Sequence, residues 1–175
     1  MKRTVIAALI AISLVAACKN KEEPTGPQQQ GQGNLMQSME EVKFLQDLVR
    51  REPGNLDGWI KLGNVLMDNS RFGEAADAYE KALAIDPKNP DVRVDLGTCY
   101  RNSKNPLKAV EEYRKAIATN PNHVNAHKNL GVALAYDLNE TSQAIAEFEK
   151  ALALAPTATD AQQLRMTIAQ LKGGK

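Results

Sequence analysis

Eight positions of this chain recur at one constant interval, the interval that separates Trp59 from Arg93. The first copy runs through Trp59, Leu62, Gly63, Leu66, Ala75, Tyr79, Ala82 and Pro87, and the second through Arg93, Leu96, Gly97, Tyr100, Ala109, Tyr113, Ala116 and Pro121. A third copy begins at His127, Leu130, Gly131 and Leu134 and continues one residue late at Ala144, Phe148, Ala151 and Pro156. We therefore expect one inserted residue in its inter-helix turn. A period of this length indicates a stacked helical repeat.

Each copy contains two short helices by its internal spacing. Leu62 and Leu66, and then Ala75, Tyr79 and Ala82, fall at helical intervals, so each predicted helix has one apolar stripe. A glycine inside the first helix costs about 1 kcal/mol relative to alanine, which indicates a close backbone approach there. The proline that ends each copy cannot continue a helix.

This pattern resembles the tetratricopeptide repeat (TPR) family, whose unit is a helix, a short turn and an antiparallel second helix that ends at a proline. The resemblance implies an all-α, right-handed superhelical solenoid with three repeats, at residues 56–89, 90–123 and 124–158. Apolar stripes predict capping helices at residues 35–55 and 159–175, and the second is one residue out of phase, which favours a solvating cap over a fourth binding unit. The family implies a protein-binding groove, no enzyme activity and no cofactor.

The inward-facing positions of the family point to a partner-binding groove. They carry over to Asp57, Lys61, Asn64, Asp95, Thr98, Arg101, Asn102, Lys128, Asn129 and Tyr136. Some TPR proteins hold a C-terminal carboxylate with a clamp of lysine and asparagine side chains. Here Ile60 and Asp95 stand where that clamp needs a cation and an amide, so the sequence argues against this ligand class. For each position, an ordinary solvated surface is the alternative.

The N-terminal residues 1–17 have the pattern of a secretory signal. Lys2 and Arg3 precede an apolar run of about 14 residues, which is short of the roughly 20 that span a bilayer. Val15, Ala16, Ala17 and Cys18 resemble the lipobox of bacterial lipoproteins, in which the cysteine is acylated. This resemblance implies a lipid-anchored envelope protein. A signal cleaved without lipidation and an uncleaved anchor are the alternatives.

The segment after Cys18 predicts a tether and a location. Residues 18–34 are polar, contain Pro24 and Pro27, and predict a flexible linker. In the sorting rule known for some bacteria, an aspartate after the cysteine retains a lipoprotein in the inner membrane; Lys19 here favours the outer membrane, facing the periplasm. Basic and acidic residues are nearly balanced, at 22 and 21, so no nucleic-acid partner is expected.

Two further groups are candidates for chemistry. Cys99 corresponds to Val65 and Ala133 in the other copies, so we interpret it as a packing residue; a reactive thiol is the alternative. His123 and His127 have a helical spacing that suits a metal, but no third ligand lies nearby, and we predict no metal site.

Three functions are consistent with these features. The first is a membrane-anchored adaptor or assembly factor that binds a protein or peptide. Within it, Arg50, Arg51, Pro53, Gly58, Trp59, Leu62 and Gly63 resemble the repeat tails of cytochrome c maturation factors, which hold apocytochromes, while lipoproteins that pilot pilus or secretion pores also carry such repeats. The second is a self-associating structural lipoprotein. Separately, Met36 and Met39 are an alternative interaction face in the first predicted cap. The third is an enzyme that uses Cys99 or the histidines.

Overall fold

The structure is a computed structural model that describes residues 27–173, with side chains from residue 36 onward. Within this range every regular element is helical. The elements are α1 (Pro27–Arg51), α2 (Leu56–Asp68), α3 (Phe72–Ile85), α4 (Pro90–Asn102), α5 (Pro106–Thr119), α6 (Val124–Val132), η1 (Ala133–Asp137), α7 (Thr141–Leu154) and α8 (Ala161–Gly173). The all-α solenoid predicted from the repeats is confirmed.

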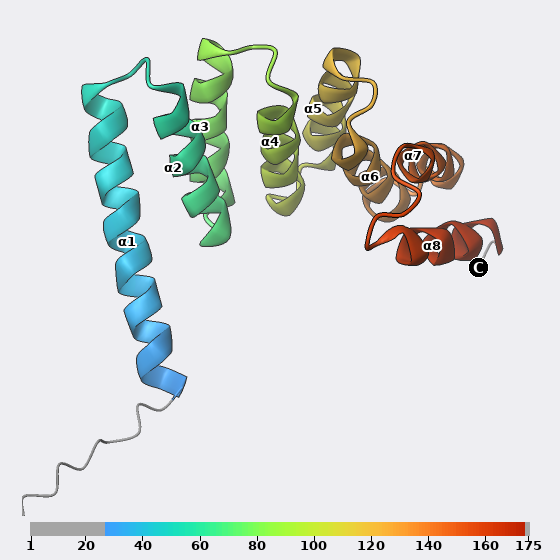
Figure 1. Ribbon diagram of the computed structural model, residues 1–175, viewed down its shortest axis with the longest axis horizontal. Coiled ribbons are helices and arrows are strands. Elements are labelled where there is room, and N and C mark those ends of the chain that lie inside the picture. Colours follow the sequence, from blue (N-terminus) through green and yellow to red (C-terminus); the bar gives the residue numbers. More distant parts are fainter. Residues whose placement is uncertain (1–26, 174–175) are drawn as a thin grey trace, which may run out of the picture.

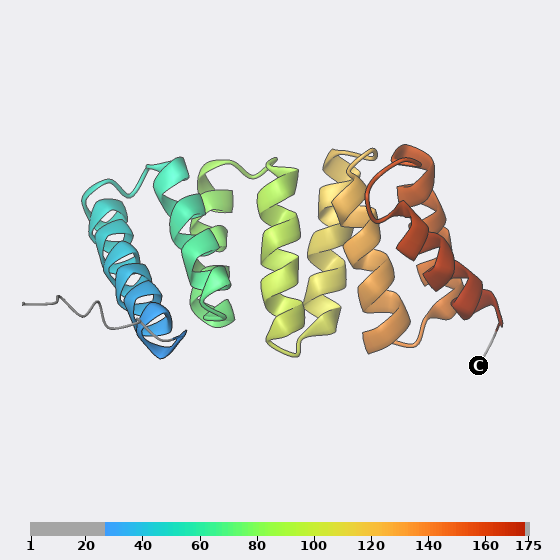
Figure 2. The same cartoon turned by 60° about the horizontal axis from the view of Figure 1, so that its bottom comes forward.

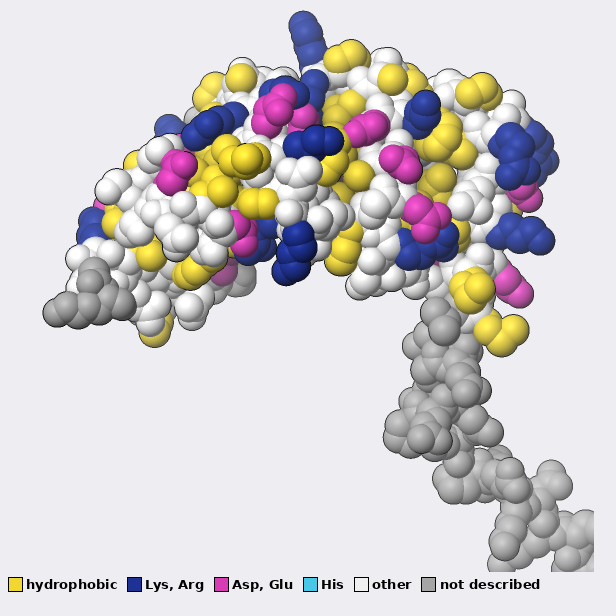
Figure 3. Space-filling view, turned by 180° about the vertical axis from the view of Figure 1, so that it is seen from behind, with side chains coloured by type: hydrophobic (Ala, Val, Ile, Leu, Met, Phe, Trp, Pro, Cys, Tyr) yellow, Lys and Arg dark blue, Asp and Glu magenta, His cyan; other side chains and the backbone are white. Residues whose placement is uncertain are grey.

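The helices stand side by side in one row, in chain order (Figures 1 and 2). Each packs mainly on the helices before and after it, and two hydrophobic clusters divide the core along the row. We call α2, α4 and α6 the inner helices and α3, α5 and α7 the outer helices. The inner helices α4 and α6 contact each other although they are not consecutive, and the row is curved (Figure 1). Figure 3 shows the resulting arch with a hollowed underside.

The repeated glycines are sites of close helix packing, as predicted. A Cβ on Gly63 would lie 2.5 Å from Cε1 of Tyr79, inside any allowed contact distance. The same substitution at Gly97 or Gly131 would meet the ring of Tyr113 or Phe148 at 2.6 Å. Each inner helix therefore lays its glycine on the aromatic ring of the outer helix in its own repeat.

The turns also repeat along the chain. Asn55, Asn89 and His123 each cap the following inner helix by accepting a backbone N–H bond. The turns inside the repeats place Ser70, Lys104 and Asn139 in the left-handed region, at φ of 59°, 61° and 58°. Ser70 and Lys104 are one repeat length apart, whereas Asn139 comes one position late, so the insertion lies before this turn residue.

The extra residue of the third repeat is absorbed in η1 and not in the turn, where the sequence pattern places it. The N–H of Leu138 bonds to the carbonyl of Ala133, five residues back, whereas the equivalent N–H of Ser103 bonds to Cys99, four residues back. One residue is thus inserted as a π-helical turn at the end of the inner helix. This placement leaves the left-handed residue Asn139 and the start of α7 unchanged.

The N-terminal end of the row differs from the sequence prediction in one respect. The sequence predicts a tether through residue 34, but helical backbone begins at Pro27. Proline suits the first turn of a helix and the following glutamines are good helix formers, so the absence of apolar residues did not mark a helix boundary. Among the described residues, no helix is both long and apolar enough to cross a bilayer.

Candidate partner-binding groove

Nine of the ten predicted groove residues lie on the inner helices α2, α4 and α6, and Tyr136 lies in η1. Asp57, Lys61, Asn64 and Asn102 are exposed, as is Tyr136 in η1. Asp95, Thr98, Arg101, Lys128 and Asn129 are half-buried. The groove side chains are therefore accessible but partly held by their neighbours.

The middle of the groove is tied together by amide and hydroxyl groups. Tyr79 donates a 2.7 Å hydrogen bond to Oδ1 of Asn64, and the hydroxyls of Thr98 and Tyr113 lie 3.2 Å apart. Nδ2 of Asn129 reaches Oγ1 of Thr98 at 3.4 Å, which links the second and third repeats. The aromatic ring of the third repeat is Phe148, which has no hydroxyl, and Val132 stands at the position of Asn64 and Thr98, so the third repeat has no equivalent hydrogen bond.

Two of the three groove cations are neutralised within the fold. Arg101 forms an ion pair with Asp137 of η1, and Lys128 pairs with Asp160 in the turn before α8. Lys61 is exposed, and none of the ion pairs among the described residues includes it. A carboxylate ligand would have to compete with Asp137 or Asp160 for the paired cations.

The acidic side chains of the groove are less involved in internal ion pairs than its cations are. Burial, and to a smaller extent the neighbouring charge of Asp91, raises the pKa of Asp95 to about 6, while His123 opposes the shift. Nδ1 of His123 accepts the capping N–H of Ala126, so Nε2 carries the proton that is donated to Asp91 at 2.9 Å. With Asp57 exposed in the first repeat, this part of the groove favours a cationic group over an anionic one.

The C-terminal end of the groove contains a cleft of about 200 Å³. It contains the predicted residues Lys128, Asn129 and Tyr136, and α8 supplies its other wall through Gln163, Leu164 and Thr167. The sequence pattern predicts only a solvating role for α8, whereas the structure makes it one wall of this cleft. The signal was present, because Leu164 and Ile168 follow Leu130 and Leu134 by one repeat length.

The candidates for chemistry have structural roles. Cys99 is fully buried, and desolvation raises the pKa of its thiol to about 12, so a reactive thiolate is disfavoured. His123 caps α6, and the ring of His127 is buried between Glu147 and the carbonyl of Pro121. No group of three or more potential metal ligands is found within the described part of the chain. Cys18 lies outside that part.

Comparisons with known proteins agree with this architecture. A crystal structure of MamA aligns with a TM-score of 0.71 at 21% identity and covers 86% of each chain. The first TPR of Spaghetti (RPAP3), bound to an HSP90 peptide, aligns at 0.63 with 24% identity over 68% of this chain and 94% of its own. The Sgt2 TPR domain from Aspergillus fumigatus gives 0.61 and 26% over 67% and 76%. No curated protein sequence matches.

The family assignment comes from the sequence of the repeats themselves. The family described as the cytochrome c-type biogenesis protein H TPR domain matches residues 28–162, which include α2 to α7 and most of α1. A match over most of the chain, together with the stacked helical fold, shows that this protein belongs to that family of TPR domains.

Proposed function

We propose that this protein is a TPR scaffold that binds a segment of an apocytochrome, or of another cytochrome c maturation factor, along its inner helices. The observation that carries the proposal is the family match over residues 28–162. The groove supports it, since it presents polar and charged side chains on the inner helices.

The charges of the groove indicate the kind of segment it would bind. Asp57, Asp91 and Asp95 lie on α2 and α4, while the cations Arg101 and Lys128 are already paired. A basic side chain of a ligand can bind the carboxylate of Asp95, or the oxygen of Asp91 that faces away from its capping histidine, without breaking an internal contact. We therefore expect a basic or mixed polar segment and not a free C-terminal carboxylate.

The location belongs to the proposal as well. The quartet Val15, Ala16, Ala17 and Cys18 supports acylation at Cys18, and several acyl chains on one residue anchor a protein firmly. The protein would then act at an envelope membrane, with the outer membrane favoured by Lys19. In cells, Cys18→Ala should move the protein from the membrane fraction to the soluble fraction. Retention in the membrane after this change would contradict the lipid anchor.

Binding can be tested with the full-length protein and a purified apocytochrome from the same host. Titration by calorimetry should give saturable binding. The double variant Asp91→Asn/Asp95→Asn should weaken it at least tenfold, because two groove charges are removed. The matched control Glu111→Gln/Glu149→Gln removes two exposed charges from outer helices and should leave binding unchanged.

The outcomes separate the alternatives. Equal loss in both double variants would show that net charge and not the groove drives binding. No binding to the apocytochrome, with a pilus or secretion subunit recovered by crosslinking in cells, would favour the pilot function. Recovery of only the protein itself, with oligomers that grow with concentration, would favour the self-associating lipoprotein.

A further inference from the structure

A second hollow lies outside the groove, between α1, α2 and α3. Its volume is about 600 Å³, larger than the cleft at the C-terminal end. The floor is apolar and is formed by Val49, Trp59, Leu62, Leu66 and Ala78. We call it the Trp59 cleft. The predicted groove positions are not among its lining residues, so the proposed function does not account for it.

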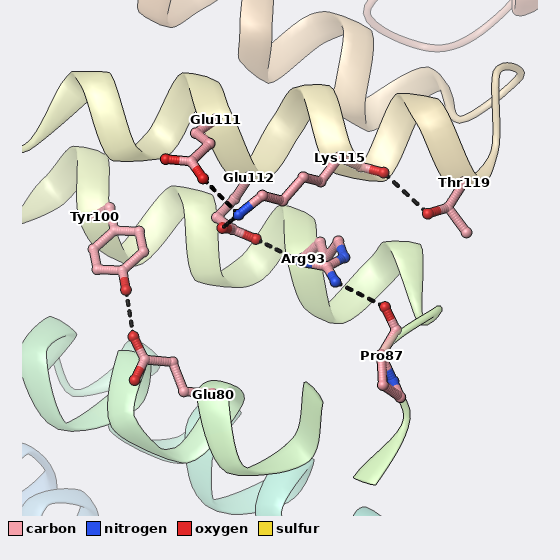
Figure 4. A network of polar contacts seen from close by, with 8 residues as sticks. All are labelled: Glu80, Pro87, Arg93, Tyr100, Glu111, Glu112, Lys115 and Thr119. Carbon is pink, nitrogen blue, oxygen red and sulfur yellow. Dashed lines mark hydrogen bonds and ion pairs between the residues drawn. The ribbon is translucent and has the colours of Figure 1, made fainter. Parts of the chain in front are cut away.

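The second repeat shows what normally occupies this place. There the position of Trp59 is taken by Arg93, and that of Ala78 by Glu112. Nη1 of Arg93 donates to Glu112 at 2.8 Å, and Nζ of Lys115 lies 2.7 Å from the other oxygen of the same carboxylate (Figure 4). This network of charged side chains joins α4 to α5 at the place that corresponds to the Trp59 cleft.

The third repeat has a histidine and a carboxylate in contact at the same place. His127 and Glu147 stand at the positions of Arg93 and Glu112, with Nδ1 2.6 Å from the carboxylate. In all three repeats the first residue also donates to the carbonyl of a proline six residues earlier: Trp59 to Pro53, Arg93 to Pro87 and His127 to Pro121. The starts of the inner helices are therefore held in the same way, and the first repeat has Ala78 where the other two have a carboxylate.

The missing carboxylate leaves cations at one end of the Trp59 cleft. Lys81 is the equivalent of Lys115, but Ala78 offers it no partner of the kind that Glu112 provides. Arg50, near the C-terminal end of α1, is a second cation of the lining. Among the described residues its ion pair is an exposed contact with Asp47, of a kind that contributes little to stability. The acids Glu74 and Asp77 lie earlier on α3, and Arg71 binds both oxygens of Glu74.

We propose that the Trp59 cleft is a docking site for an amphipathic segment of a partner protein. The segment places an apolar side chain on Trp59 and Leu62 and a carboxylate beside Arg50 and Lys81, where the second repeat has its own Glu112. An amphipathic helix between two helical walls is a recurrent mode of peptide recognition. The charges of both signs along α3 match a peptide better than a fatty acid, which has one carboxylate and no cation.

The chain supplies its own reporter for this site. Trp59 is the only tryptophan, so its fluorescence reports on the cleft alone. The probe is a synthetic helical peptide with leucines along one face and glutamates beside them; in the matched peptide each glutamate is glutamine. The first peptide should change the fluorescence of the full-length protein saturably, with an affinity at least fivefold higher than that of the second.

Two variants test whether the peptide binds in the Trp59 cleft. Ala78→Glu introduces the carboxylate of the second repeat and should weaken binding of the glutamate peptide at least tenfold. Lys81→Gln removes an exposed rim cation, carries little risk for folding, and should weaken binding about threefold or more. The matched control Lys115→Gln changes the equivalent lysine of the second repeat and should leave the fluorescence titration unchanged.

Several results would overturn the proposal. These are no saturable change with the glutamate peptide, equal affinity for the two peptides, or full binding by Lys81→Gln. Displacement of the peptide by dodecanoate at lower concentration than by unlabelled peptide would assign the cleft to an acyl carboxylate instead. Asp91→Asn/Asp95→Asn should leave this titration unchanged, so failure here is distinguishable from failure of the groove.

Discussion

Arg93 and Glu112 form an ion pair of 2.8 Å between α4 and α5, and their side chains are only 18% and 10% exposed. The same position holds His127 with Glu147 in the third repeat, and Trp59 with Ala78 in the first. The same position therefore holds a different pair of side chains in each of the three repeats, while the backbone is alike. The pair in the second repeat also joins Lys115 to the network, as Figure 4 shows.

Breaking this pair should destabilise the protein. Glu112→Ala leaves the guanidinium of Arg93 without its carboxylate in a poorly solvated place, and we expect a loss of about 2–4 kcal/mol in the free energy of unfolding. Urea denaturation followed by circular dichroism measures this loss. The double variant Arg93→Trp/Glu112→Ala copies the first repeat and should recover at least half of it. If the double variant is less stable than Glu112→Ala alone, the repeats are not interchangeable at this position.

The close packing of glycine on the aromatic ring gives a second prediction. Gly97→Ala would place a methyl group 2.6 Å from Cε1 of Tyr113, so the buried ring or the helices must shift. Overpacking of this kind costs about 1–3 kcal/mol. The control Gly73→Ala, at a helical glycine with nothing within 4 Å, should be neutral or slightly stabilising. Thermal melting of both variants tests this; equal melting temperatures would contradict the packing.

The sequence predicted the repeats because each repeated residue has one local physical task. Gly63, Gly97 and Gly131 allow a close approach, and Pro87 ends a copy, so periodicity alone located the helices and their contacts. The one-residue insertion was also detected. Its placement was not, because a π-helical turn in η1 and a longer turn have the same spacing in the sequence.

The site was harder to predict because pairings between repeats are not periodic. Arg101 and Lys128 lie on inner helices, but their partners Asp137 and Asp160 come from η1 and from the turn before α8. The Trp59 cleft was missed for a related reason. The cleft is present where Ala78 replaces the carboxylate of Glu112. The repeat pattern consists of residues that the copies share, so it does not indicate a side chain that one copy lacks.

The raised pKa of Asp95 makes stability depend on pH. Its value of about 6 in the folded protein exceeds the ordinary 3.8, so the folded state holds this proton more tightly than the unfolded state. This contribution is complete below pH 3.8 and is lost as pH rises through about 6. Asp95→Asn removes the cost of ionisation, and at pH 7 it should stabilise the protein by about 1–2 kcal/mol.

The measurement is urea denaturation of both proteins from pH 4 to pH 7. The stability difference between Asp95→Asn and the original protein should grow with pH and level off above about pH 6.5. Asp57→Asn, at an exposed acid of the same groove, serves as the control and should show no such growth. Parallel curves for Asp95→Asn would contradict the raised pKa.

The thiol of Cys99 should not react with thiol reagents in the folded protein. The side chain is fully buried, and burial raises the pKa of its thiol to about 12. A reagent therefore cannot reach the sulfur, and the reactive thiolate form is not populated at neutral pH. The Cys18→Ala form should react with a thiol reagent only as fast as it unfolds, and completely in urea. Rapid reaction under native conditions would instead point to an accessible, activated cysteine.

The π-helical turn gives the last prediction. Deleting Tyr136 restores the repeat length that separates the first two copies, and those copies show that this backbone folds with an ordinary α-helical end. The variant should therefore retain its helical content and unfold cooperatively. Asp137 would no longer be held at the end of η1, so Arg101 would be released into the groove. We expect the deletion to weaken binding of a basic segment at least threefold, because an unpaired cation then repels it. Cooperative unfolding with unchanged affinity would show that the inserted residue has no part in the groove, and loss of cooperative unfolding would show that the third repeat needs it to fold.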